Sequence, residues 1–141
     1  MLAEACDQAG LEALVPFDET VHAGTTPQTI YDANMKLLRS AQGVVANLCP
    51  FRGSEPDSGT VFEVGVAVML GLPVAAYGVP SGSYGDRVTA KLDADGVLRD
   101  EDGLIVENYG LPLNLMLARS VHIAPTFRLA LRHIAKQLAQ P

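Results

Sequence analysis

The sequence predicts an α/β protein in which a parallel sheet is flanked by helices, in a flavodoxin-like or Rossmann-like arrangement. Helical and short strand patterns alternate along most of the 141 residues, as expected when crossover helices join parallel strands. The clearest strand patterns are almost continuously apolar, which is typical of strands buried on both faces. The length falls in the usual range of roughly 50–200 residues for one domain, so we expect residues 1–141 to form a single domain.

The elements are expected in a regular order. An N-terminal helix is expected over Met1–Ala9 and a short strand over Leu11–Pro16. A longer helix begins at Pro27, because proline suits the first helical turn, and its apolar face continues up to Gly43. The other expected elements are two buried strands and two helices: Val44–Leu48, Ser58–Leu70, Pro73–Tyr77 and Pro125–Leu138.

The start of the predicted sheet is irregular. A right-handed crossover uses a helix to join two parallel strands, yet the pattern opens with the helix at Met1–Ala9. We therefore expect the first strand of the sheet to be missing from the chain.

The segment Gly78–Gly110 is rich in turn residues and acids. Its acidic runs, Asp93–Gly96 and Asp100–Gly103, raise the possibility of a calcium site, but they do not meet the glycine and glutamate spacing of an EF-hand loop. The Asp-Gly turns on either side of Val97 and Leu98 favour a solvated hairpin instead.

The composition argues against several classes of partner. Ten Lys and Arg against 16 Asp and Glu give a net charge of −6, which repels nucleic-acid backbones and anionic membrane surfaces. No apolar run reaches the roughly 18 residues of a membrane span. The two cysteines lack metal-ligand spacing, so we expect reduced thiols, a cytoplasmic protein and no metal site. His22, His122 and His133 share no ligand spacing either, and we expect them to be surface or packing residues.

Glu63 is the strongest candidate for a catalytic residue. It is the only charged residue between Ser58 and Val79, and a buried carboxylate is costly unless it is paired or used. No Lys or Arg lies one helical turn away, whereas Gly59 and Ala67 leave room for a ligand there. We therefore assign Gly59 and Glu63 to a substrate site, with Glu63 as nucleophile or general acid/base.

Asp57 and Ser58 stand at the expected start of the same helix. The loop before them leaves a buried strand, and open α/β sheets bind ligands outside the carboxyl ends of their strands. Both side chains also suit helix capping, with Ser58 as the N-cap. Capping and ligand binding therefore remain alternatives for Asp57.

Two motifs carry a resemblance to a known family. Residues 57–65 read DSGTVFEVG and residues 113–117 read LNLML. Their order and spacing, over about Leu2 to Leu117, resemble the nucleoside 2-deoxyribosyltransferase family. Related N-glycoside hydrolases of nucleotides share the fold and the Gly-x-x-x-Glu core.

The resemblance implies a transferase that needs no cofactor and acts on 2-deoxyribonucleosides and free nucleobases. Glu63 would attack the anomeric carbon of the sugar and form a covalent ester, and Asp57 would bind the sugar hydroxyls. Asn114 and Met116 would complete the site of a neighbouring subunit. A homo-oligomer, dimeric or larger, follows from such a shared site.

Asn34 departs from the pattern of this family. Many members carry an aspartate at this position that protonates the leaving base, and an amide cannot deliver a proton. We therefore count Asn34 among the substrate-binding residues. The proton would come from Asp57, from solvent or not at all, because Asp32 lies on another helical face.

Three other functions remain open. A hydrolase of deoxynucleosides or deoxynucleotides would use the same glutamate, but the Asp57 carboxylate would repel a 5′-phosphate by about 1–4 kcal/mol, which favours nucleosides. A non-catalytic nucleoside-binding protein would keep Glu63 while proton transfer is lost with Asn34. A flavodoxin-like regulatory domain is least favoured, because no aspartate ends the strand Val44–Leu48.

Overall fold

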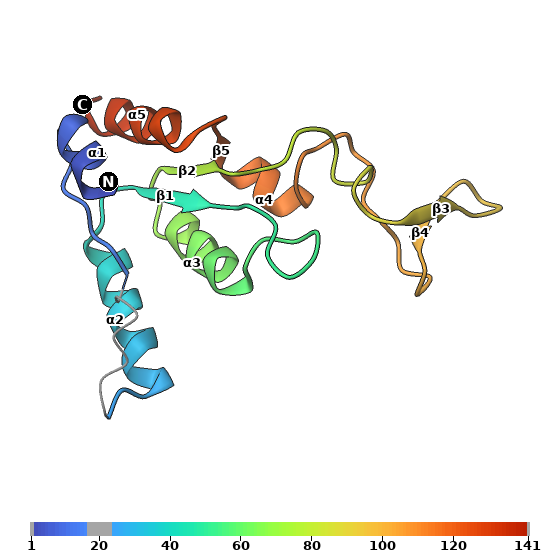
Figure 1. The fold of residues 1–141 in the computed structure, drawn as a ribbon, viewed down its shortest axis with the longest axis horizontal. Coiled ribbons are helices and arrows are strands. Elements are labelled where there is room, and N and C mark those ends of the chain that lie inside the picture. Colours follow the sequence, from blue (N-terminus) through green and yellow to red (C-terminus); the bar gives the residue numbers. More distant parts are fainter. Residues whose placement is uncertain (1, 17–23, 141) are drawn as a thin grey trace.

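The fold is known from a computed structural model, which describes residues 2–16 and 24–140. Helices and strands alternate through most of this part of the chain (Figure 1). In chain order the elements are α1 (Leu2–Gln8), α2 (Pro27–Ser40), β1 (Val44–Asn47), α3 (Ser58–Met69), β2 (Val74–Tyr77), β3 (Ala90–Leu92), β4 (Leu98–Asp100), α4 (Leu115–Ser120), β5 (His122–Ile123) and α5 (Phe127–Leu138).

A parallel sheet in the order β1-β2-β5 forms the centre of the molecule. Figure 1 shows α5 on one side of this sheet and α3 on the other. Successive residues of β2 point to opposite faces, so Ala75 packs in a cluster with Ile134 of α5, whereas Ala76 packs in a second cluster with Val64 of α3. The predicted α/β class is confirmed.

The first edge of the sheet is open in the described part of the chain. Strand β1 pairs with β2 on one side only, and all of its residues line a cavity of about 520 Å³. The predicted strand over Leu11–Pro16 is wrong. Leu11 and Leu14 line the same cavity, and no described strand lies beside them to supply the hydrogen bonds that a strand requires.

Capping residues set the starts of the main helices. The Thr26 side chain accepts a hydrogen bond from the Thr29 backbone N–H, with Pro27 in the first turn of α2 as predicted. The predicted N-cap of α3, Ser58, is wrong by one residue. Asp57 is the N-cap, and its Oδ2 accepts from the Thr60 backbone N–H at 2.9 Å.

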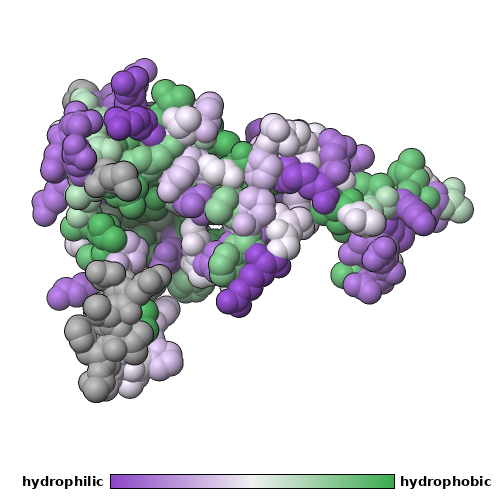
Figure 2. All heavy atoms as spheres, in the orientation of Figure 1, coloured by the Kyte–Doolittle hydropathy of each residue, from purple (hydrophilic) through white to green (hydrophobic). Residues whose placement is uncertain are grey.

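The segment after β2 forms an arm that extends away from the sheet (Figure 1). Strands β3 and β4 pair in an antiparallel hairpin, as predicted. The acids of this arm shape its turns: Asp93 Oδ1 accepts from the backbone N–H groups of Asp95 and Val97, and Asp93 Oδ2 pairs with Arg99 at 2.7 Å. Figure 2 shows hydrophobic atoms along the arm, where Leu92, Leu104 and Ile105 are exposed.

His122 and His133, expected to be surface or packing residues, pack against each other. The rings of His122 and His133 stack with centroids 3.7 Å apart, and burial, with His122 and Lys136 nearby, lowers the pKa of His133. Sequence spacing could not show this, because β5 and α5 bring the rings together. His22 lies outside the described residues.

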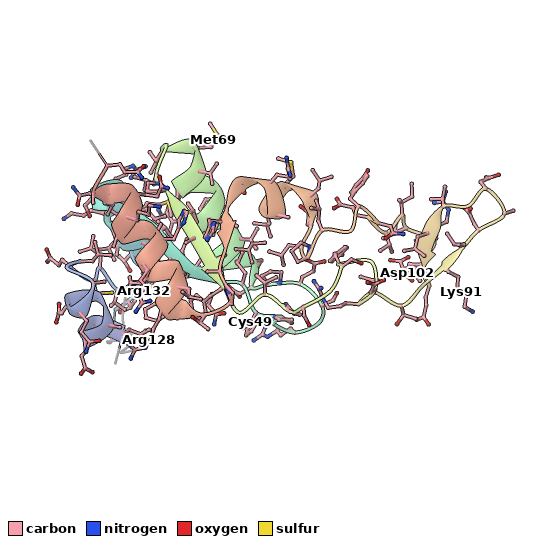
Figure 3. The ribbon with its side chains drawn as sticks, turned by 90° about the horizontal axis from the view of Figure 1, so that it is seen from above. Cys49, Met69, Lys91, Asp102, Arg128 and Arg132 are labelled. Atoms are coloured by element: carbon pink, nitrogen blue, oxygen red, sulfur yellow. The ribbon has the colours of Figure 1, made fainter. Side chains whose placement is uncertain are left out.

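Neither α4 nor β5 was expected from the sequence, because both are short. Cys6 and Cys49 are free thiols, and Cys49 follows the end of β1 (Figure 3). Among the described residues, no helix combines the length and apolar character that a membrane crossing requires.

Candidate active site

Glu63 and Asn34 meet where α2 packs against α3. Glu63 lies one turn before Ala67, which is fully buried, and Asn34 lies one turn before Leu38, which packs against the same core. Both side chains therefore face inward. Asn34 Nδ2 donates a hydrogen bond to Glu63 Oε1 at 3.0 Å, although the two residues are 29 positions apart in the chain.

The amide orientation of Asn34 follows from its partner. A carboxylate oxygen accepts hydrogen bonds, so the amide nitrogen must face Glu63. The carbonyl oxygen Oδ1 then points elsewhere. It is buried and has no hydrogen-bond partner among the described residues.

The cavity beside β1 contains this pair. Asn34 and Glu63 line it together with Asn47 at the carboxyl end of β1 and Thr60 in the first turn of α3. Its volume of about 520 Å³ lies within the range of roughly 300–1,000 Å³ for small-molecule sites. A ligand in this cavity would reach the Glu63 carboxylate directly.

The cavity is negatively charged. The only charged residues in its described lining are Glu63 and Glu12, both acids. Within the described ranges the single salt bridge is the one between Arg99 and Asp93 on the arm, so no basic side chain there neutralises Glu63. This agrees with the absence of a Lys or Arg one turn away in the sequence.

Asp57 and Gly59 lie next to the cavity and do not belong to its lining. Asp57 Oδ2 caps α3 and is also 3.3 Å from Thr60 Oγ1. A Cβ on Gly59 would come within 3.1 Å of the same Oδ2. Gly59 therefore keeps the space around the Asp57 carboxylate open.

Asn114 and Met116 lie at a different cavity. It has a volume of about 610 Å³ and lies between α3 and α4, where Gly65 and Met69 contribute to its lining. Asn114 Oδ1 accepts from the Met116 backbone N–H at 3.0 Å and caps α4. Within one chain, the structure therefore does not bring Asn114 and Met116 into the cavity of Glu63.

Sequence reasoning missed two polar residues of the Glu63 cavity, Asn47 and Thr60, and a third, Glu107, that holds a residue of the other cavity. Asn47 ends a buried strand, and that position in an α/β sheet could have drawn attention to it. Thr60 lies within the motif at residues 57–65, but it contacts the Asp57 carboxylate because α3 starts with Asp57 as its N-cap. Glu107 holds Asn114 by accepting from its Nδ2 at 2.8 Å, and no spacing rule connects two residues across an irregular loop.

Fold and site together define an open α/β protein with a carboxylate, held by an amide, at the carboxyl edge of a parallel sheet. The family model described as nucleoside 2-deoxyribosyltransferase matches residues 1–116. The chain belongs to this family. A 2-deoxyribosyltransferase from Leishmania mexicana superposes with a TM-score of 0.79 at 29% identity, over 96% of this chain and 83% of that one. An uncharacterized protein of Schizosaccharomyces pombe is 27% identical over 97% of this chain and 80% of its own length.

Family membership has direct consequences for function. It supports a deoxyribosyltransferase-type enzyme of nucleoside metabolism, and it implies nucleoside and nucleobase substrates.

Proposed function

We propose that the protein transfers a 2-deoxyribosyl group between nucleobases, with Glu63 as the nucleophile. The observation that carries this proposal is the position of Glu63. Its carboxylate lines a ligand-sized cavity, an amide N–H of Asn34 holds one of its oxygens, and no basic residue of the described chain neutralises it. Such a carboxylate is free to act as a nucleophile.

The proposed reaction has two displacement steps. A Glu63 oxygen attacks the anomeric carbon, the bond from that carbon to the base nitrogen breaks, and the bonding electron pair leaves with the base, which takes up a proton from Asp57 or solvent. A nitrogen of a second base then attacks the ester from the vacated face and gives up its proton to the same acceptor, and the carboxylate departs. Two inversions give net retention, as in retaining glycosidases. Water in place of the second base would give hydrolysis.

Asp57 is proposed to bind the sugar hydroxyls. As the N-cap it stands at the start of the helix that carries Glu63, between one and two turns away along α3. Its contacts with Thr60 N and Oγ1 fix the carboxylate, and Gly59 leaves the approach to it open. A carboxylate there suits a neutral nucleoside better than a 5′-phosphate.

Asn114 and Met116 are proposed to act in the site of a second subunit. Helix α3 is apolar on almost every side, yet its residues Phe62 and Met69 are exposed in the single chain, as is its C-cap Leu70. Met69 points outward in Figure 3. A helix that is apolar all round is normally buried. Met116 is 71% exposed and lines the same cavity as Met69 and Asn114. A second copy of the chain that covers this exposed side of α3 would therefore contact Asn114 and Met116.

The variant Glu63→Gln tests the proposal. The protein is incubated with 2′-deoxyinosine or thymidine and a free acceptor base, and the products are followed by chromatography. Because glutamine keeps the shape and can still accept from Asn34, only the nucleophile is lost. We expect base exchange to fall by at least roughly 10³-fold.

Glu12→Gln is the matched control, because it removes the other carboxylate of the same cavity. We expect it to retain base exchange. Release of free sugar without exchange would favour the hydrolase, and faster cleavage of deoxynucleoside monophosphates would contradict the role of Asp57. Binding of nucleosides with no turnover by the wild-type protein would favour the non-catalytic alternative.

A further inference from the structure

Glu107 holds the start of α4 with both of its carboxylate oxygens. Its Oε1 accepts from Asn114 Nδ2 at 2.8 Å, and its Oε2 accepts from the Leu115 backbone N–H at 2.8 Å. Glu107 and Asn114 are both half-buried. Hydrogen bonds to a charged acceptor are about twice as strong as those between neutral groups. Glu107 therefore fixes the Asn114 side chain together with the backbone that follows it.

The backbone beside Glu107 is itself held in place. The preceding residue, Val106, is buried and donates its backbone N–H to the carbonyl of the first residue of β4 at 2.8 Å. On the outgoing side of the arm, a Cβ on Gly85 would lie 3.1 Å from Glu107 O. The Tyr84 backbone N–H donates to Leu111 O at 2.7 Å. The Glu107 carboxylate therefore stands on fixed backbone, as a group that orients another side chain requires.

Glu107 decides which way the Asn114 amide points. An ionised carboxylate only accepts hydrogen bonds, so the amide nitrogen must face Glu107. Asn114 Oδ1 then accepts from the Met116 backbone N–H at 3.0 Å. These contacts use one N–H of Asn114 Nδ2, and no described residue accepts from the other. Because Asn114 lines the cavity between α3 and α4, this second N–H is the donor that its side chain has left to offer there.

A donor complements the acids of the proposed site. Glu63 and Asp57 are carboxylates, which accept hydrogen bonds and donate none when ionised. Under the proposed function, Asn114 of one chain completes the site that contains these two acids in a second chain. Its N–H can then donate to an oxygen of the substrate, a contact that neither carboxylate can make. An amide turned the other way would present its oxygen and add a third acceptor.

We propose that Glu107 is a positioning residue for the site of the second subunit, where it keeps an N–H of Asn114 directed at a hydrogen-bond acceptor of the nucleoside. This role rests on the proposed function and adds a residue to it, because Glu107 acts through Asn114 and does not itself touch the substrate. A defect at Glu107 therefore impairs the site of the partner chain and leaves Glu63 of its own chain able to react.

The variant Glu107→Gln tests the orientation. Glutamine has one acceptor oxygen where glutamate has two, so its amide nitrogen must face either Asn114 Nδ2 or the Leu115 N–H, and one hydrogen bond is lost. We expect kcat/KM for base exchange to fall about 10- to 100-fold, which is the scale of a misplaced substrate contact. Glu101→Gln changes an exposed acid of the same arm and is the control that should keep wild-type kcat/KM. Wild-type kcat/KM in Glu107→Gln would overturn the proposal.

The double variant Glu107→Gln with Asn114→Asp separates positioning from support of the fold. Its donor and acceptor are exchanged: the glutamine donates to the aspartate and accepts from the Leu115 N–H, while the aspartate still accepts from the Met116 N–H. All three protein hydrogen bonds are kept, so the midpoint of thermal unfolding should match that of the wild-type protein. The kcat/KM should stay low, because an aspartate has no N–H to offer. Recovery of wild-type kcat/KM would mean that Glu107 only supports the fold, and it would overturn the proposal.

Co-expression of Glu107→Gln with Glu63→Gln shows which site carries the defect. In a mixed dimer, the chain with Glu107→Gln keeps its nucleophile and receives an unaltered Glu107 and Asn114 from its partner. Half of random dimers are mixed and each holds one unaltered site of two, so base exchange should rise to about a quarter of the wild-type value. Asp57→Asn is the control: it lies in the same site as Glu63 of its own chain, so co-expression with Glu63→Gln should give no recovery.

The outcomes separate this role from the proposed function. If Asn114→Ala recovers with Glu63→Gln but Glu107→Gln does not, the role of Glu107 is overturned and the transferase with a shared site stands. If the wild-type protein exchanges no base between nucleosides, the proposed function is overturned as well.

Discussion

Single side chains fix the loops on the α4 side of the molecule. Tyr84 on the arm donates its hydroxyl hydrogen bond to Glu55, which lines the cavity between α3 and α4. This hydrogen bond, with burial and the negative charges of Glu55 and Glu107, raises the pKa of Tyr84 to about 12. The hydrogen bond between Tyr84 and Glu55 therefore connects the arm to the loop before α3, and it depends on the protonation of Tyr84.

We predict that Tyr84 titrates near pH 12 and that Glu55→Gln moves its pKa down toward the ordinary 10. The measurement is phenolate absorbance in an alkaline titration of the wild-type protein minus Tyr84→Phe. Because the folded state holds the proton more tightly than the unfolded state, this contact stabilises the fold fully below pH 10 and is lost as pH rises to about 12. A Tyr84 component near 10 in the wild-type protein would contradict the contact.

At the scale of the secondary-structure elements, the ends of β1 and β2 approach so closely that glycine is required at position 78. Gly78 follows β2 with φ of +76°, and a Cβ there would lie 2.3 Å from Asn47 Oδ1 at the end of β1. Asn47 cannot simply turn away, because the same oxygen accepts from the Cys49 backbone N–H at 3.2 Å. Glycine at this position keeps a polar residue of the cavity in place.

Gly78→Ala should destabilise the protein by about 1–3 kcal/mol through backbone strain and also reduce activity, because Asn47 must move. Thermal unfolding and kcat/KM are measured together. Gly82→Ala is the control: its φ is also positive, at +85°, but a Cβ there meets nothing within 4 Å. Equal loss of activity in both variants would argue against a role for the contact with Asn47.

At the scale of the whole molecule, the proposed sharing of a site between two chains can be tested. The Glu63 cavity and the Asn114 cavity are separate in one chain, so a shared site predicts that two different defects can complement each other. Glu63→Gln and Asn114→Ala chains are each expected to be nearly inactive as homo-oligomers.

Co-expressed in equal amounts, the two variants should recover about a quarter of wild-type activity. Half of random dimers are mixed, and each mixed dimer holds one intact site of its two. Activity of the co-expressed pair is compared with the sum of the separate variants. No recovery in a preparation in which a tag on one variant co-purifies the other would contradict a shared site.

Much of this protein could be predicted from its sequence. The continuous apolar run at β1, the proline at the start of α2 and the glycine at the end of α3 are local signals, and the elements that they predict are confirmed. Glu63 stood out for a physical reason that also needs no structure: a lone carboxylate in an apolar helix requires a use or a partner.

Only the tertiary structure decided what surrounds that carboxylate. Contacts such as Asn34 with Glu63, Asn114 with Glu107 and His122 with His133 join distant segments, and no periodicity specifies which distant residues meet. The same reason explains the wrong strand at Leu11–Pro16, because a strand exists only when a neighbour offers its backbone. The sequence by itself determined the fold class, the motif and the candidate nucleophile. Packing decided that an amide stands beside it, with one oxygen that has no hydrogen-bond partner among the described residues.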